Sequence, residues 1–176
     1  MKKIICLIFL SFLLFYVYAQ NGRISNYSYS SSPMKIMGFT KDTTLSQAKK
    51  QINEWKVTWS FRDYDNTIVM NKVSWQSLDF ESIWITFDSY GLIKWIACNS
   101  PSGNINNIQS TFLKIVSNLP YRRMLINPSI GSTTYIYNGY NESEFAVYST
   151  NDNKYLPPIS FGFYFNSSIY ESGFNP

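Results

Sequence analysis

Paired carboxylates are the residues of this chain whose types and spacing come nearest to catalytic chemistry. Asp63 and Asp65, and Asp79 and Glu81, stand two positions apart, which puts both side chains of a pair on one face if the segment is extended. Two carboxylates across a cleft, one with a raised pKa, are the machinery of glycoside hydrolysis. One hypothesis for this chain is therefore a small secreted carboxylate-dependent hydrolase of the glycosidase type.

Two observations weigh against that hypothesis. Asp63 and Asp65 fall in a predicted turn, where Asp is favoured for local hydrogen bonding. Asp79 and Glu81 flank Phe80, and burial of Phe80 would direct both acids to solvent.

The sequence lacks the residues and motifs that other kinds of catalysis and cofactor binding require. The chain has no histidine, which excludes Ser-His-Asp catalysis and His-based zinc sites. No phosphate-binding loop or dinucleotide fingerprint is present. A calcium site at Asp63, Asp65 and Asn66 would lack the glycine and the distal glutamate of a calcium loop. We therefore predict a protein that is not an enzyme and that has no cofactor and no metal.

Aromatic side chains are the more distinctive feature, at 18% of the chain. On the predicted strands they either pack in the core or lie on the surface, where they could stack on sugars or anchor a protein interface. In one predicted hairpin Trp84 points opposite to Ile83 and Ile85, so this Trp is exposed unless both sheet faces are covered. The candidate partner-binding aromatics are Trp59, Trp75, Trp84, Trp95, Tyr135 and Tyr137.

The N-terminus predicts export. Lys2 and Lys3 precede an apolar run, Ile4–Tyr18, and Ala19 offers a small residue for cleavage before Gln20. This is the layout of a secretory signal peptide, and the run is shorter than the roughly 20 residues that span a bilayer. We therefore expect a secreted or periplasmic protein without a permanent membrane span.

Charge and cysteine content agree with that compartment. Charged residues make up only 15% of the chain, below the roughly 25% typical of soluble domains. Cleavage of the leader removes two of the 15 basic residues and lowers the net charge from +4 to +2, so no nucleic-acid partner is expected. Cleavage also removes Cys6 and leaves Cys98 alone, which we interpret as a buried structural residue rather than a reactive thiol.

Two amphipathic helices are predicted. The first follows a capping box formed by Thr44 and Gln47, and its apolar positions run from Leu45 to Trp55. The second begins near Asn107 and ends at Pro120.

Strand-like segments follow each helix, separated by turn residues. After the first helix they are Val57–Phe61, Thr67–Met70, Val73–Phe80 and a hairpin over Ile83–Ala97. After the second they are Thr133–Tyr137, Glu144–Thr150 and Ile159–Phe165.

Short motifs suggest a family. Met37-Gly38-Phe39 with Thr43-Thr44, and later Phe87-Asp88-Ser89-Tyr90-Gly91-Leu92-Ile93, resemble the beta-lactamase-inhibitor-protein-like fold, which includes small outer-membrane assembly lipoproteins. They also resemble secreted bacterial proteins of uncharacterised function with a similar helix-plus-meander unit. The resemblance covers Ile36–Phe165 and implies binding through a concave sheet face. The chain lacks the lipoprotein cysteine, which argues against the assembly branch.

These observations combine into one prediction. We expect an α+β fold of two tandem units, each with one amphipathic helix on a three- or four-stranded antiparallel sheet. The expected divisions are a signal peptide (1–19), a disordered tail (20–33) and two units (34–98 and 99–170). The expected function is non-enzymatic binding of a protein or glycan partner, in the envelope or outside the cell, through an aromatic-bearing sheet face.

Overall fold

The computed structural model describes residues 28–129, 131–152, 154–155, 157–169 and 172. The predicted signal peptide and residues 20–27 of the predicted tail lie outside this part of the chain. The elements in chain order are α2 (Leu45–Glu54), β1 (Trp59–Arg62), a 3₁₀ turn η1 (Asp63–Asp65), β2 (Thr67–Trp75), β3 (Leu78–Phe87), β4 (Ile93–Pro101), α3 (Ile105–Ile115), β5 (Tyr121–Asn127), β6 (Ser132–Asn138), β7 (Phe145–Asn151) and β8 (Ile159–Tyr164).

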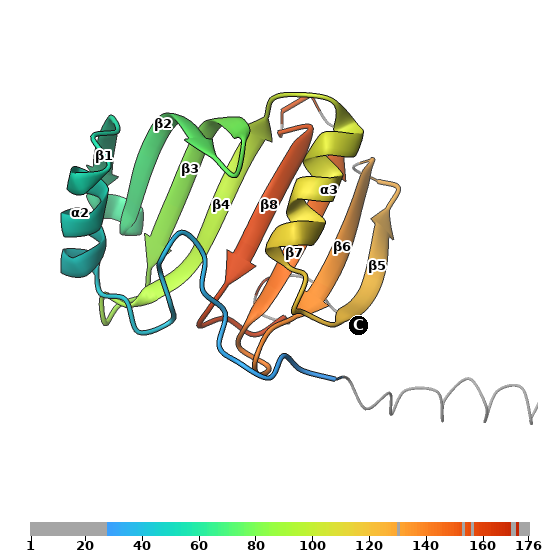
Figure 1. Cartoon of the computed structure of the whole chain (residues 1–176), viewed down its shortest axis with the longest axis horizontal. Coiled ribbons are helices and arrows are strands. Elements are labelled where there is room, and N and C mark those ends of the chain that lie inside the picture. The colour runs from blue at the N-terminus through green and yellow to red at the C-terminus, as the bar shows by residue number, and fades with distance from the viewer. Residues whose placement is uncertain (1–27, 130, 153, 156, 170–171, 173–176) are drawn as a thin grey trace, which may run out of the picture.

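The eight strands form one antiparallel sheet in the order β1-β2-β3-β4-β8-β7-β6-β5, with both helices on the same face (Figure 1). The prediction of two tandem units, each a helix on its own small sheet, is therefore wrong. Strands β4 and β8 pair from Trp95 with Tyr164 to Asn99 with Ser160. Two separate sheets would leave both of these strands as edges with unpaired backbone groups, and their pairing satisfies those groups.

The first helix is held by the predicted cap. The N–H of Gln47 donates to the Thr44 hydroxyl at 3.3 Å, and the Gln47 side chain accepts from the Thr44 N–H at 2.8 Å. Ala48 and Ile52 of α2 are fully buried against the sheet. The capping box and the apolar stripe predicted from the sequence are thus confirmed.

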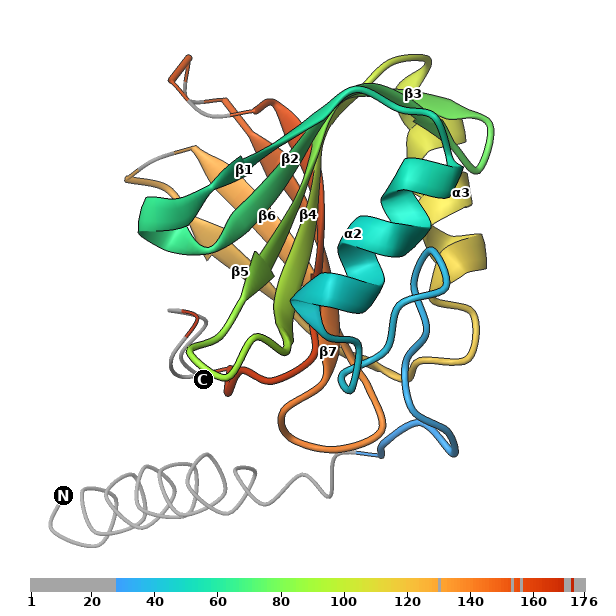
Figure 2. The ribbon, with the colours of Figure 1, turned by 90° about the vertical axis from the view of Figure 1, so that its left-hand side faces the viewer.

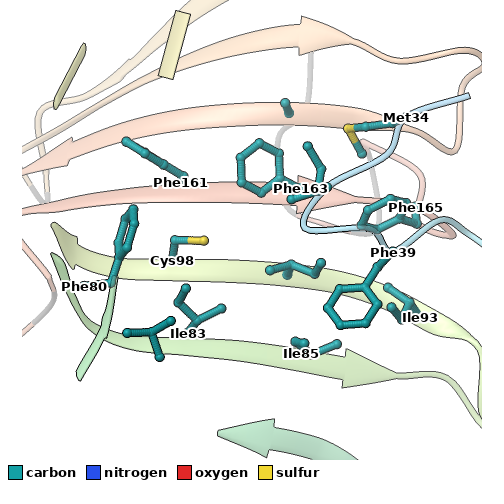
Figure 3. Packing of buried hydrophobic residues seen from close by; sticks show 14 of the residues in the cluster. Met34, Phe39, Phe80, Ile83, Ile85, Ile93, Cys98, Phe161, Phe163 and Phe165 are labelled. Carbon is teal, nitrogen blue, oxygen red and sulfur yellow. The ribbon is translucent and has the colours of Figure 1, made fainter. Parts of the chain in front are cut away.

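The main core lies between the sheet and the helices. Phe112 of α3 is 1% exposed and contacts the rings of Tyr137, Tyr148, Phe161 and Phe163. Between the two helices, the chain before α2 covers the sheet (Figures 1 and 3), and its buried apolar side chains are Met34, Ile36 and Phe39. The core therefore has three covering elements on one sheet face.

Cys98 belongs to this core. Its side chain is fully buried on β4, and burial raises the pKa of the thiol well above its ordinary value. Its prediction as a buried residue is confirmed.

The strands differ from the sequence prediction in two places. The predicted third strand, Val73–Phe80, is divided between β2 and β3 by a tight turn at Gln76 and Ser77, which both have positive φ. Strand β5 was not predicted, because Arg122-Arg123 before a short apolar run gives no clear alternation. Among the described residues, no helix has the length and hydropathy needed to cross a bilayer.

Candidate functional site on the open sheet face

The sheet has a covered face and an open face. In the described part of the chain both helices lie on the covered face, and Figure 2 shows the sheet edge-on with α2 and α3 on the same side. We call the opposite side the open face. On this face Ile169, from the segment after β8, packs with Ile136 on β6 and with Phe145 and Val147 on β7.

The candidate aromatics divide between these two faces. Trp84 lies between the core residues Ile83 and Ile85 on β3, so alternation places it on the open face. Trp95 on β4 lies on the same face, because it pairs with Tyr164, which alternates with the core residue Phe163 on β8. The other four candidates pack against the main core on the covered face; they are Trp59, Trp75, Tyr135 and Tyr137.

A stack of three aromatic rings crosses the open face. The rings of Trp95 and Tyr164 lie 6.3 Å apart at 23°, and those of Tyr164 and Phe145 lie 4.4 Å apart at 6°. Burial disfavours the charged phenolate and raises the pKa of Tyr164 to about 12. The phenol is therefore protonated at physiological pH. Sequence analysis did not select Tyr164, although it alternates with the core residue Phe163.

Trp84 is set into a smaller cluster beside this stack. The guanidinium carbon of Arg62 lies 4.6 Å from the centre of the Trp84 ring, and Arg62 forms an ion pair with Asp65 at 2.7 Å. The indole Nε1 of Trp84 is buried and has no hydrogen-bond partner among the described residues. Arg62 thus covers one side of the Trp84 ring and limits its access to a ligand.

A line of small polar side chains runs across the open face next to the aromatic rings. Strand pairing places its members side by side on six neighbouring strands. Two hydrogen bonds link neighbours, from Asn99 Nδ2 to Ser82 Oγ at 3.3 Å and between the Thr134 and Ser149 hydroxyls at 3.0 Å. We call this set the polar row; in spatial order it is Asn71, Ser82, Asn99, Ser160, Ser149 and Thr134.

A groove of about 300 Å³ lies over the polar row on β4, β8, β7 and β6. Ala97 in this groove has only a methyl group, and Gly162, its partner across β4 and β8, lets the Val147 and Tyr164 side chains approach the backbone closely. A Cβ on Gly162 would lie 2.7 Å from Val147 Cγ2 and 3.0 Å from the Tyr164 ring. Tyr164 and Pro157 are further lining residues, and every lining residue is uncharged.

The carboxylates of the hydrolase hypothesis are not brought together. Asp63 and Asp65 lie in η1, which precedes Thr67 at the start of β2. Asp79 is hydrogen-bonded to Ser74 near the other end of β2, and Asp79 and Glu81 are both exposed. In the part of the chain that the structure describes, no three acidic, Cys or His side chains group as metal ligands.

The groove on the open face combines an aromatic ring, hydroxyls and amides, and none of its lining residues is charged. Such a surface can offer hydrogen-bond donors and acceptors next to flat apolar rings. Comparison of the chain with family models, with curated proteins and with solved structures gives no match. The chemistry of the site is therefore the basis on which a function can be proposed.

Proposed function

We propose that this chain is an exported, non-enzymatic binding protein that takes a glycan on the open face of its sheet. Export is supported by the leader-like N-terminal sequence. The single observation that carries the choice of ligand is the uncharged groove beside the ring stack of Trp95 and Tyr164.

A sugar matches this groove in two ways. Its hydroxyl groups both donate and accept hydrogen bonds, as do the Ser, Thr and Asn side chains of the groove. The apolar faces of its rings pack on aromatic side chains, and the half-buried Tyr164, which stacks on Trp95, lines the groove. A few converging polar groups next to an apolar wall are typical of small-molecule sites.

A protein partner matches less well. The anchor residues of protein interfaces are large aromatic or Arg side chains at the centre of the contact. The groove is lined largely by small side chains, among them Ala97, Gly162 and Ser160.

The test measures binding of the full chain to immobilised polysaccharides. It compares wild type with one Trp variant and one Tyr variant. Trp95→Ala removes a ring of the open face, and Tyr90→Ala removes a ring that is 88% exposed in the β3–β4 turn. We expect retention of wild type and of Tyr90→Ala, and weaker retention of Trp95→Ala with an unchanged circular dichroism spectrum. Failure of wild type to bind any glycan, or capture of a protein that Trp95→Ala loses, would overturn the proposal.

A further inference from the structure

The polar row has a direction, and that direction constrains the ligand. Its six members occupy β2, β3, β4, β8, β7 and β6 at one level of the sheet. Neighbouring strands are ~4.8 Å apart, so the row offers a hydrogen-bonding group at regular intervals over about 24 Å. We propose that the ligand is an uncharged, linear polysaccharide whose chain lies along the polar row, perpendicular to the strands. This inference rests on the proposed glycan function.

The linear shape follows from how far the row extends beyond the groove. The groove covers the row from Asn99 on β4 to Thr134 on β6. Ser82 on β3 and Asn71 on β2 continue the line outside it, half-buried and exposed respectively. A chain that fills the groove and is long enough to leave it meets further amide and hydroxyl groups in the same line. A compact or branched glycan reaches only a few of them.

The absence of charge on the ligand follows from the lining of the site. None of the six side chains of the row is ionisable, and no lining residue of the groove is charged. A carboxylate or sulfate group placed here would lose water without gaining a cationic partner, which is costly.

The aromatic residues lie beside the row and supply its apolar wall. At the next level of the sheet, Trp84, Ala97 and Gly162 stand on adjacent strands. Beyond them the Trp95 and Tyr164 rings stack. A sugar chain on the row therefore has hydroxyl and amide partners below it, while Ala97 and the Tyr164 ring, which lies over Gly162, supply apolar surface along one side.

The first test is an array of oligosaccharides probed with the full chain. It holds neutral linear glucans, mannans and xylans, branched neutral glycans, and oligogalacturonides, each in a series of lengths. We expect the neutral linear series to bind, with affinity rising with length by roughly fivefold per added pair of hydrogen bonds. Preference for charged or branched glycans, or no gain with length, overturns this inference and leaves the glycan function standing. No binding to any glycan overturns the proposed function itself.

The second test uses three Asn→Ala variants with the best-bound series. Asn99→Ala removes an amide inside the groove and should weaken short and long oligomers alike, by roughly fivefold. Asn71→Ala removes an amide outside the groove and should weaken only the long ones. Asn107→Ala, an exposed amide on α3, serves as the matched control and should change neither. If Asn71→Ala and Asn107→Ala behave alike at every length, the ligand does not follow the polar row.

Discussion

The covered and open faces of this sheet use side chains of different kinds on the same strands. On β8, Phe161 and Phe163 point into the main core, while Ser160, Gly162 and Tyr164 alternate with them on the open face. The covered face is filled by helices and by the chain before α2, and therefore determines stability. The open face has a smaller buried cluster, of Ile136, Phe145, Val147 and Ile169, and next to it a groove lined with hydrogen-bonding groups. We therefore expect substitutions on the covered face to have the larger effect on stability, and the proposed glycan binding to depend on the open face.

We expect the largest loss of stability from a substitution in the main core. Phe112→Ala removes a fully buried ring that contacts four other aromatic residues, and we expect a loss of about 3–5 kcal/mol in the free energy of unfolding. Leu113→Ala, on the same helix but 44% exposed, should cost less than about 1 kcal/mol. Urea unfolding of both variants measures the difference. Equal losses would mean that α3 does not pack as the structure shows.

A smaller loss is expected where the chain before α2 is fastened to the sheet. The buried Glu144 carboxylate accepts hydrogen bonds from the N–H groups of Met34 at 2.9 Å and Tyr140 at 3.3 Å. Glu144→Ala leaves these donors without their acceptor and should cost about 1–3 kcal/mol. Glu142→Ala, at an exposed position of the same turn, is the control. Hydrogen exchange should show faster exchange at Met34 in the first variant only, and equal exchange in both would refute the role of Glu144.

On the open face the sharpest prediction concerns pH. Since the pKa of Tyr164 is about 12 when folded and about 10 when unfolded, the unfolded chain releases this proton first as pH rises. Stability is therefore constant with respect to this group below pH 10 and falls as pH rises from about 10 to 12. Unfolding of wild type and Tyr164→Phe across this range measures the contribution. An identical pH dependence in the two proteins would show that the phenol is not buried.

The smallest effect on stability is expected for the polar row. Asn99 is half-buried, and its side chain donates a long hydrogen bond of 3.3 Å to Ser82, so Asn99→Ala should change stability by no more than about 0.5 kcal/mol. We expect the same substitution to weaken glycan binding. An open-face substitution would then affect binding, whereas a covered-face substitution such as Phe112→Ala affects stability. A loss of several kcal/mol in thermal or urea unfolding would instead make the row part of the core.

Local sequence patterns predicted the local structure well. The Thr44 and Gln47 cap, the apolar stripe of α2 and the opposite orientation of Trp84 on its strand all depend on neighbouring residues, and the structure confirms them. The prediction for Cys98 succeeded for the same reason, because its apolar neighbours indicated a buried strand.

Features that depend on distant pairing were not predictable. Strands β4 and β8 are about sixty residues apart along the chain, and no local signal shows that they join into one sheet. The polar row is composed of single Ser, Thr and Asn residues on six strands, and each of them resembles an ordinary turn or surface residue. Only the register of the strands shows that they form a line, which is why sequence analysis chose aromatics, four of which pack against the core.

The most direct test of the central claim is an amide NMR titration of the full chain with the oligosaccharide that binds best. We expect the amide chemical shifts of Asn99, Ser149 and Ser160, on three adjacent strands, to change, and those along α2 and α3 to stay unchanged. Shifts concentrated on the two helices, or on one strand from end to end, would contradict it.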